Sequence, residues 1–432
     1  MSHDYRKTLD KASWSSIHWT VFLSTALGFF AWGFIYSLSV LVTTWPIVSE
    51  EEVPLLLTLS PVFFLVGNFI FGSLADRIGR RPIFILTLSI YTVGVVGIIL
   101  SQNFYSLLFF VAMAQFGVGG EEPPALASLA EFTPIKHRGK AIVLSSNFYN
   151  IGAAAAAGLI LIGFSSIDFQ RTLLGLASVI LIGTIIFTRR KLPESIRWLA
   201  KKGRLKEAEN LLNMMKEEDA DDVQTTKEIV SLRLKYSLRF AFVVLVLLGI
   251  SQLTTYGLLA FVIGPYYYSS IAPQITLVAN AGASLAGLVG AYVIEKMSRK
   301  IFSLFSYLGG FLTVVLVLLA VDLMASSIVV FFIFLFLNMI FSELGWATRV
   351  VLEPELAKET NMRSTFVSLV RVVAWSFYIA SIYLTSSLAP SNFVALNVVL
   401  WGVGALATFG WFFKGVETGR KSLEAITGES HS

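Results

Sequence analysis

The sequence is dominated by long apolar runs, and their length limits the possible folds more than any other feature. A helix needs about 20 apolar residues to cross the hydrocarbon core of a bilayer, and twelve runs are close to that length or above it. They lie at about 18–43, 54–75, 82–100, 105–130, 140–162, 171–189, 239–264, 273–295, 301–322, 326–350, 364–388 and 393–413. Only 14% of the 432 residues are charged, too few for the surface of a soluble protein of this size. We therefore predict an all-α integral membrane protein with twelve transmembrane helices.

The distribution of lysine and arginine predicts how the chain is oriented. If the N-terminus lies in the cytoplasm, the cytoplasmic gaps hold nearly all of the basic residues between the runs, and Arg171 is the only base in the opposite gaps. Positive charge accumulates on the cytoplasmic side of membrane proteins. We therefore expect a multi-pass protein of the cell membrane with both termini in the cytoplasm. Topology also accounts for the net charge of +5, so we predict the lipid bilayer, and not nucleic acid, as a partner.

The longest polar segment, 190–238, divides the twelve runs into six and six. The predicted units are a cytoplasmic segment 1–17, a six-helix bundle 18–189, a cytoplasmic linker 190–238, a second six-helix bundle 239–413 and a cytoplasmic tail 414–432. The linker begins with short amphipathic helices and continues into an acidic stretch at 217–222. Two interpretations are open: the linker is a tether, or its helices brace the cytoplasmic ends of both bundles.

Two charged motifs occupy equivalent places in the two halves. Gly72–Pro82, with the sequence GSLADRIGRRP, lies between the second and third runs, and Glu295–Lys300, EKMSRK, lies between the eighth and ninth. After the fourth run, Glu131 and Arg138 have counterparts in Glu355 and Arg363 after the tenth, with one extra residue in the second copy. The chain therefore consists of two parallel repeats, an arrangement that fits a transporter whose two bundles rock about a central site.

These motifs resemble signatures of the major facilitator superfamily. Gly72–Arg81 resembles its loop 2–3 signature, while residues 131–139 and 193–198 resemble signatures of its sugar-porter and organic-ion branches. The segments GGEEP at 119–123 and YGLLAFVIGP at 256–265 are similar to the group with synaptic-vesicle-2-like, nicotinate-type and organic-ion transporters. The resemblance implies two six-helix bundles, transport by alternating access and a charged cytoplasmic gate. We predict ten gate residues: Asp76, Arg80, Glu131, Arg138, Glu194, Arg197, Glu295, Arg299, Glu355 and Arg363.

Some gate contacts can be anticipated. Asp76 is expected to cap or pair with cations at the cytoplasmic end of the other half, and Arg80 and Arg138 to pair with Glu131 or Glu194. Ion pairs that form in one conformation and break in the other bias a two-state equilibrium. The alternative is that the arginines only fix topology.

Two adjacent acids lie deep in the fourth run. Glu121 and Glu122 are about ten residues, or ~15 Å, from its cytoplasmic end, where a charge needs a partner or a water-filled cavity. We predict that they carry protons, with one of them facing the cavity. The alternative is that they satisfy backbone groups freed by Pro123 and Pro124, which break the helix.

Glu343 and Arg371 each lie about eight residues, or ~12 Å, from the cytoplasmic end of successive runs, so they can meet. As a structural pair they would neutralise each other. As a functional pair, Arg371 would hold a substrate carboxylate with its planar fork, and Glu343 would be its partner in the empty state and a proton carrier. In the second case the substrate is an anion.

Aromatic and amide residues within the runs complete the predicted substrate site, because binding cavities combine apolar walls with a few polar groups. Besides Arg371 and Glu343, the predicted substrate-binding residues are Trp32, Tyr36, Asn147, Gln252, Tyr256, Trp346 and Trp375. Asn150 and Asn280 belong to the same class. Any of them can instead serve packing or interhelical hydrogen bonding. Sugar porters carry a Gln-Gln…Asn pattern in the seventh run, and here only Gln252 remains, with Gly257 at the Asn position. A hexose is therefore not the expected substrate.

No pattern in the sequence predicts an enzyme. The four histidines lie outside any cluster, and phosphate-binding and dinucleotide-binding glycine motifs are missing, so we predict no catalytic residues, no metal and no cofactor. The function we predict is proton-coupled symport of a small organic anion, such as a monocarboxylate, by a monomer. One alternative is a carrier of sugars or other neutral polyols, by symport or uniport. Another is a membrane sensor that binds its ligand without transporting it.

Overall fold

The computed structural model describes residues 5–164, 166–215, 237–321 and 327–427. Within these ranges the chain is helical and contains no β-strand. Twelve helical segments there are long and apolar enough to cross a membrane, which confirms the all-α prediction. They are Ser16–Thr44, Val53–Ile78, Arg80–Leu100, Phe104–Phe132, Ile135–Ile162, Ile167–Arg189, Leu238–Tyr267, Ser269–Val293, Arg299–Val321, Ile328–Glu355, Thr360–Thr385 and Pro390–Lys414. The acidic stretch 217–222 lies outside the described residues.

The first six spans form one group of helices, which we call the first group. Its α-helices are α2 (Ser16–Leu41), α3 (Val53–Ile78), α4 (Arg80–Leu100), α5 (Phe104–Gly119), α6 (Glu122–Phe132), α7 (Arg138–Ile162) and α8 (Ile167–Arg189). The short helices η1 (Val42–Thr44) and η2 (Ile135–His137) follow α2 and α6.

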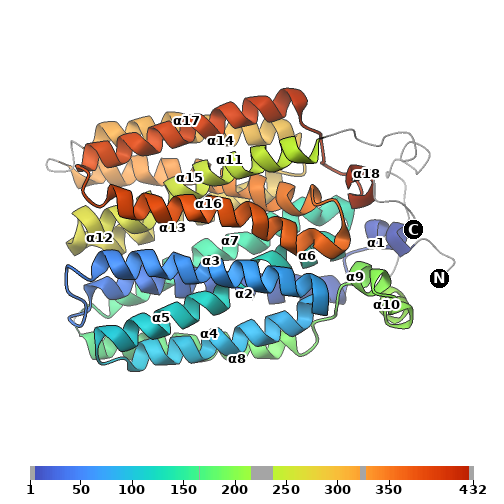
Figure 1. The fold of residues 1–432 in the computed structure, drawn as a ribbon, viewed down its shortest axis with the longest axis horizontal. Coiled ribbons are helices and arrows are strands. Elements are labelled where there is room, and N and C mark those ends of the chain that lie inside the picture. The colour runs from blue at the N-terminus through green and yellow to red at the C-terminus, as the bar shows by residue number, and fades with distance from the viewer. Residues whose placement is uncertain (1–4, 165, 216–236, 322–326, 428–432) are drawn as a thin grey trace.

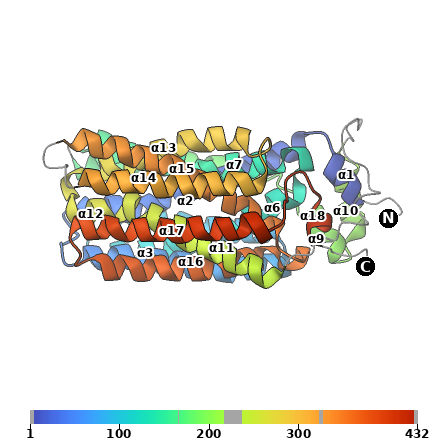
Figure 2. The same cartoon turned by 90° about the horizontal axis from the view of Figure 1, so that it is seen from above.

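The last six spans form the second group. Its α-helices are α11 (Leu238–Gly257), α12 (Ile263–Tyr267), α13 (Ala272–Val293), α14 (Arg299–Val321), α15 (Ile328–Glu355), α16 (Arg363–Thr385) and α17 (Pro390–Lys414). The short helices η3 (Leu258–Val262), η4 (Ser269–Ile271) and η5 (Thr360–Met362) connect them. Figure 1 shows the two groups side by side, and Figure 2 shows the same bundle from above.

The two groups meet mainly where α7 packs on α13 and α3 packs on α16. Within the first group, small residues let neighbouring helices approach closely. A Cβ atom added at Gly33 of α2 would collide with the backbone of Tyr149 in α7, and one at Gly152 of α7 would collide with the carbonyl of Phe30. Such contacts between small residues drive helix association in lipid, where apolar burial supplies little. Large apolar side chains on the outside, such as Phe187 and Leu406, are exposed in the isolated chain.

Two spans are interrupted. The fourth span breaks between α5 and α6, and Pro123 and Pro124 lie in the first turn of α6, where a missing N–H leaves no intrahelical bond unmade. The seventh span contains the π-helical turn η3 between α11 and α12. Irregular turns of this kind are frequent at functional sites. The break after α5 lies near the middle of its span, whereas η3 lies nearer the Tyr267 end of its own.

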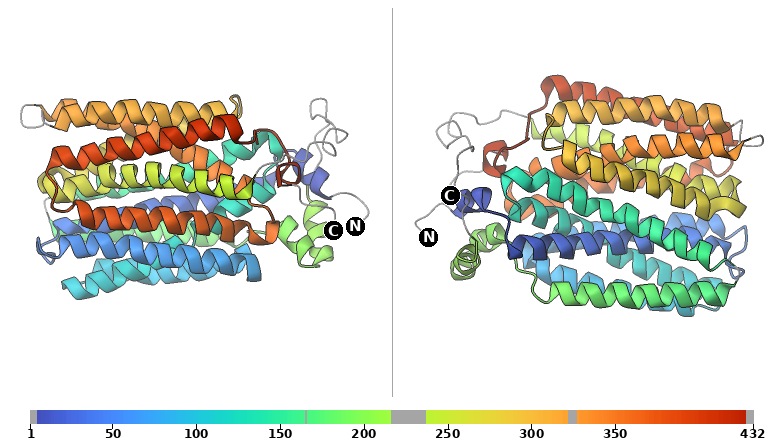
Figure 3. Two further views of the ribbon diagram at one scale, coloured as in Figure 1. Left: turned by 45° about the horizontal axis from the view of Figure 1, so that its top comes forward. Right: turned by 180° about the vertical axis from the view of Figure 1, so that it is seen from behind.

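The first and last helices, α1 (Tyr5–Lys11) and α18 (Leu423–Thr427), lie at the same end of the bundle as α9 (Ile196–Lys201) and α10 (Leu205–Leu212). We call this the terminal end, and Figure 3 shows these short helices beyond the long ones in two further views. Arg197 of α9 donates to the Glu131 carbonyl at 2.8 Å and pairs with Asp10 and Glu424 at 2.9 and 3.1 Å. These contacts favour the brace interpretation for the described part of the linker.

Candidate functional site

A pocket lies between the two groups, halfway along the bundle. The space not filled by atoms among its lining residues is about 410 Å³, including space open to solvent. Helices α2, α7, α11, α15 and α16 and the turn η3 contribute to its walls. The lining residues are Trp32, Tyr36, Tyr149, Asn150, Gln252, Leu253, Tyr256, Gly257, Phe261, Glu343, Trp346, Trp375 and Tyr378. Eight of these thirteen side chains are aromatic, so the pocket presents mainly flat apolar surfaces.

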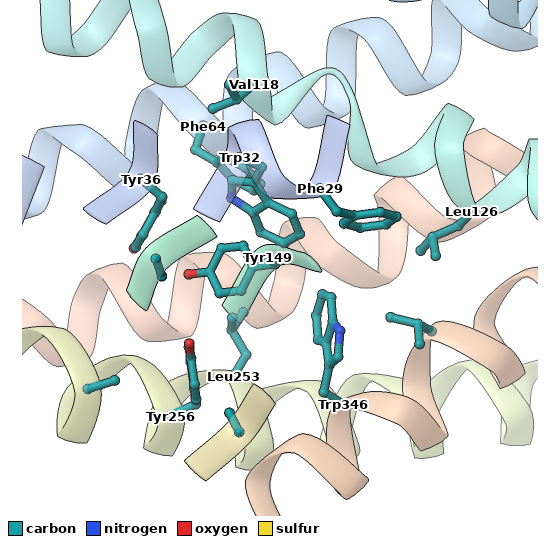
Figure 4. Close-up of a cluster of buried hydrophobic side chains, with 14 of the residues drawn as sticks. Phe29, Trp32, Tyr36, Phe64, Val118, Leu126, Tyr149, Leu253, Tyr256 and Trp346 are labelled. Atoms are coloured by element: carbon teal, nitrogen blue, oxygen red, sulfur yellow. The ribbon is translucent and has the colours of Figure 1, made fainter. Parts of the chain in front are cut away.

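Aromatic contacts close the pocket at both ends. Towards the terminal end, the rings of Trp32 and Trp346 lie 5.7 Å apart and join the two groups. On the opposite side, the Tyr36 and Tyr378 hydroxyls are 3.5 Å apart, and the Tyr36 ring lies 5.3 Å from Phe261. Figure 4 shows Trp32 and Tyr149 of the first group facing Trp346 and Tyr256 of the second. The structure therefore has an occluded pocket.

Polar groups of the pocket are concentrated around Glu343. Its Oε2 accepts a hydrogen bond from Asn150 Nδ2 at 2.7 Å. The Tyr256 hydroxyl lies 3.1 Å from Asn150 Oδ1 and 2.6 Å from Asn280 Oδ1. Within the described part of the chain, Glu343 Oε1 and three indole N–H groups at the pocket have no hydrogen-bond partner, those of Trp32, Trp346 and Trp375. Buried polar groups are normally satisfied, so these atoms are available to a ligand.

Arg371 does not line the pocket. It pairs with Glu122 of α6 and Glu353 of α15, each at 2.8 Å, and Glu353 also pairs with Arg349 at 3.3 Å. These two acids and two bases form a neutral cluster that is almost completely buried, and we call it the four-charge cluster. The Arg371 guanidinium lies 4.5 Å from the ring centre of Trp346. The indole of Trp346 therefore lies between Arg371 and the pocket.

The expected pair between Glu343 and Arg371 is absent, and that prediction was wrong. Glu343 lies six residues before Arg349 on α15, which at about 3.6 residues per turn places it roughly 120° further round the helix. Arg349 and Glu353 lie on the side of α15 that contacts Gln252 of α11 and Arg371 of α16, whereas Glu343 faces α7 through Asn150. The sequence indicates how deep Glu343 and Arg371 lie in their spans, but not which helix face each of them occupies.

Glu121 and Glu122 have separate partners, as expected for adjacent residues on a helix. Glu121 forms an ion pair with Arg189 of α8 and accepts from Thr87 at 2.6 Å, while Glu122 accepts from Asn68 at 3.0 Å besides its pair with Arg371. Neither acid lines the pocket, contrary to the expectation that one of them would. The alternative linking both acids to backbone freed by proline is also wrong, because the prolines lie in the first turn of α6.

At the terminal end, Glu131 forms ion pairs within the first group and with the second group. This buried carboxylate receives Arg80 at 2.8 Å and Arg363 of the second group at 2.9 Å, as well as the Ser195 hydroxyl. Asp76 pairs with Arg80 at 3.1 Å. Asp76 also caps the start of α16, accepting from the Thr365 backbone N–H at 2.8 Å. The expected contacts of Asp76 and Arg80 across or near the group boundary are therefore present.

Arg138 has other partners than Glu131 or Glu194, so that expectation was wrong. It pairs with Asp10 of α1 at 3.3 Å and donates to the Lys421 carbonyl at 2.9 Å. The position of the short polar helix α1 could not be foreseen from the sequence. Burial raises the pKa of Asp10, while the guanidinium of Arg197 acts in the opposite direction.

The second repeat reproduces part of this arrangement. Glu194 accepts from the backbone N–H groups of Arg80 and Arg81 at 3.0 and 3.1 Å. Glu417 accepts from those of Arg299 and Lys300 at 3.0 and 3.4 Å. The two acids thus cap equivalent helices, α4 and α14, and Glu417 was missed because nothing marks it as a counterpart of Glu194 in the sequence.

Two predicted gate residues of the second repeat also contact other elements. Glu295 pairs with Arg299 at 3.5 Å and accepts from the Lys140 N–H of α7 at 3.0 Å. Glu355 accepts from the Thr418 hydroxyl at 2.7 Å and lies within electrostatic range of Arg299 and Arg138.

Most of the predicted substrate residues come together. Seven of the nine line the pocket: Trp32, Tyr36, Gln252, Tyr256, Glu343, Trp346 and Trp375. Asn147 instead donates to the Ser284 carbonyl of α13 at 2.9 Å, and Arg371 belongs to the four-charge cluster. The sequence reasoning missed Tyr149, Phe261 and Tyr378, which look like ordinary packing residues in an apolar run. It also missed Arg189, Arg349 and Glu353, although the spacing of the last two, i and i+4, places them on one helix face.

Comparison with known proteins shows similarity to membrane transporters. A family model described as "Sugar (and other) transporter" matches residues 47–429. The niacin transporter NiaP of Acinetobacter baylyi is 28% identical over 282 residues, 61% of this chain and 63% of that protein. A putative niacin/nicotinamide transporter of Bacillus subtilis is 32% identical over 153 residues, 35% of this chain and 37% of that protein. The matched segments thus span less than two thirds of either relative.

Solved structures share the fold. The proton:xylose symporter XylE, of the major facilitator superfamily, superimposes with a TM-score of 0.77 at 16% identity, covering 96% of this chain and 99% of that one.

Proposed function

We propose that this chain, which belongs to the sugar (and other) transporter family of the major facilitator superfamily, moves a small organic solute across a membrane by alternating access. The occluded pocket between two helix groups supports this proposal, as does the set of ion pairs at the terminal end. The positive-inside rule places the terminal end in the cytoplasm. Opening there requires Glu131 and Arg363 to separate, so the gate residues control access to the pocket from that side.

The pocket chemistry favours a flat aromatic solute. Its walls are formed by eight aromatic side chains, which pack well against a planar ring through offset-stacked and edge-to-face contacts. The unpartnered indole N–H groups of Trp32, Trp346 and Trp375 are donors for a carboxylate or ring nitrogen. Two relatives are named as niacin transporters, and nicotinate combines a planar ring with these acceptors. We therefore propose a flat aromatic monocarboxylate as the solute.

The observation that carries proton coupling is the position of Glu343. It is the one carboxylate among the lining residues, and they include no lysine or arginine. A solute carboxylate about 5 Å from an ionised Glu343 would be repelled by roughly 3 kcal/mol at an effective dielectric constant of 20. A proton on Glu343 removes this repulsion and adds a donor. The anion and the proton therefore bind together, which makes the transporter a symporter. Arg371 is not required as the direct anchor of the anion, since two glutamates neutralise it.

A sugar or polyol carrier is the second candidate. The amides of Asn150 and Gln252 and the Tyr256 hydroxyl at the pocket suit hydroxyl groups, and Arg371 is paired with acids outside the pocket. This alternative predicted that Arg371 would be held by Glu343. The actual partners are Glu122 and Glu353.

Uptake by proteoliposomes tests the proposal. Labelled nicotinate, xylose and an organic amine are compared with and without a pH gradient, for the wild type, Glu343→Gln and the control Glu50→Gln, an exposed acid at the other end of the bundle. We expect nicotinate accumulation driven by the gradient in the wild type and the control. Glu343→Gln should still exchange nicotinate but no longer respond to the gradient.

Three results would contradict the proposal. Uptake of xylose without nicotinate would establish the second candidate. Nicotinate uptake that ignores the pH gradient would remove the symport. Binding of nicotinate without any uptake would indicate a sensor.

A further inference from the structure

Gln252 is the pocket residue that touches the four-charge cluster through a hydrogen bond. Its side-chain oxygen accepts from Arg349 Nη1 at 2.7 Å, and its Nε2 donates to Ser342 Oγ at 3.3 Å. Gln252 is almost fully buried, and Arg349 is completely so. Gly345 lies against its stem, since an added Cβ there would be 3.1 Å from Gln252 Cγ. The amide is therefore held from two sides.

The chemistry of arginine fixes which way this amide faces. A guanidinium has five N–H donors and no acceptor, so only the oxygen of Gln252 can face Arg349. The Nε2 group carries two N–H bonds, and one of them is used by Ser342. The other N–H has no further partner among the hydrogen bonds of the described residues, and Gln252 is one of the residues that line the pocket. In this arrangement Gln252 has a donor left for a ligand, while its oxygen is directed at Arg349.

Arg349 keeps its charge at this depth because the cluster is balanced. Glu353 pairs with both Arg349 and Arg371, and Glu122 pairs with Arg371. Breaking one member of a buried pair leaves an uncompensated charge, which is strongly destabilising. The cluster therefore holds Arg349 in place independently of the ligand.

We propose that Arg349 is a positioning residue that determines specificity: by holding the Gln252 oxygen, it makes the pocket select solutes with a hydrogen-bond acceptor at that point. This inference rests on the proposed function, because it assumes that the pocket binds the transported solute. A carboxylate fits this site, since both of its oxygens accept. A primary carboxamide of the same shape has one acceptor oxygen, so only one of its two orientations meets the Gln252 N–H; in the other its NH₂ group meets the Gln252 NH₂. Without Arg349, the Gln252 amide can rotate by 180° and form a hydrogen bond with either ligand.

Nicotinate and nicotinamide are a matched pair of probes, and their binding can be followed at one pH by quenching of tryptophan fluorescence in the purified full-length protein. The main variant is Arg349→Met with Glu353→Gln, which leaves the Glu122–Arg371 pair balanced. Gln252→Met removes the amide and its bond with Arg349 but changes no residue of the cluster. The triple variant, with all three substitutions, completes a double-mutant cycle.

We expect the wild type to prefer nicotinate by about tenfold, roughly the value of one well-placed hydrogen bond to a charged group. The preference should be lost in the Arg349→Met/Glu353→Gln variant and in Gln252→Met. The triple variant should show no further change, because Arg349 acts through Gln252. A structural role alone would weaken both ligands equally.

Different results overturn different claims. If the wild type binds neither probe, the proposed function fails. If the wild type prefers nicotinate but Gln252→Met retains that preference, only the role of Gln252 fails. The role of Gln252 also fails if Arg349→Met/Glu353→Gln changes the selectivity by the same factor in the wild type and in Gln252→Met. Gln252→Met keeps the inference falsifiable even if the cluster variant does not fold.

Discussion

Replacement of Glu131 by glutamine should open the terminal end. Glutamine has nearly the same shape, but it removes the charge that holds Arg80 and Arg363 at 2.8 and 2.9 Å. Arg80 keeps Asp76 at 3.1 Å. Among the contacts of the described residues, Arg363 then keeps that with the Pro354 carbonyl, 3.1 Å from its Nε. The loss therefore falls on the arginine that connects the second group to the first.

The size of the effect follows from the burial of this pair, in which neither side chain is exposed. Leaving one buried charge without its partner costs about 3 kcal/mol at the lower end of measured values. In a conformation open at the terminal end, water solvates Arg363, so the cost applies only to the closed form. A change of about 3 kcal/mol corresponds to about a 150-fold shift in the ratio of open to closed molecules.

Cysteine accessibility measures this shift directly, because the chain has no cysteine of its own. Ser368 of α16 is buried against α3, where its hydroxyl donates to the Asn68 carbonyl at 3.0 Å. In a Ser368→Cys background, we expect a membrane-impermeant maleimide to react about a hundredfold faster after Glu131→Gln, as long as the open form is rare.

The matched control is Glu207→Gln. Glu207 pairs with Arg204 at 2.6 Å, but the two side chains are 55% and 47% exposed, and such surface pairs contribute little. Its labelling rate should equal that of the parent. The Glu131→Gln protein is compared in the same way. If its labelling rate is also within twofold of that of the parent, the Glu131 ion pairs do not hold the terminal end closed.

Other predictions concern stability. Arg189→Met should lower the free energy of unfolding by about 3–5 kcal/mol, because it leaves the buried Glu121 unpaired; adding Glu121→Gln should restore most of the loss, and a thermal melt without such recovery would contradict this. Glu417→Gln should destabilise the protein by about 1 kcal/mol at pH 7, since it removes the cap of α14. Burial alone would raise the pKa of Glu417, but hydrogen bonds from Ser298 and three backbone N–H groups lower it from 4.5. Its stabilising contribution is therefore present above pH 4.5 and lost as the pH falls through the lower folded-state pKa, so melts of wild type and variant should converge there; a constant difference would refute the assignment.

The twelve spans could be predicted because length and hydropathy are properties of each run by itself. The same is true of the two charged motifs, whose residues are recognisable without knowing how the two halves pack. Seven pocket residues were also within reach, because polar and aromatic groups are conspicuous in an apolar run.

Pairings between helices were harder to predict, because they depend on which face each helix presents. Glu343 and Arg371 lie at comparable depth, yet Glu343 of α15 contacts Asn150 of α7, whereas Arg371 of α16 pairs with Glu122 and Glu353. Phe261 enters the pocket through the π-helical turn η3, which changes the helix face and has no sequence signal that we recognised. Arg189 ends a span, where a cation is expected to mark topology, but its long side chain reaches back to Glu121.

The pairing of Glu131 with Arg363 has a consequence that concerns symmetry. In a dimer with a twofold axis, each contact between subunits occurs twice with the partners exchanged, and two fused repeats follow the same geometry. The counterpart of Glu131–Arg363 is Glu355–Arg138. Only the first is a direct ion pair, since Arg138 turns to Asp10 and Lys421, and Glu355 to Thr418. Segments at the two ends of the chain have thus made equivalent positions unequal, and the same substitution in the two repeats will have different effects on opening.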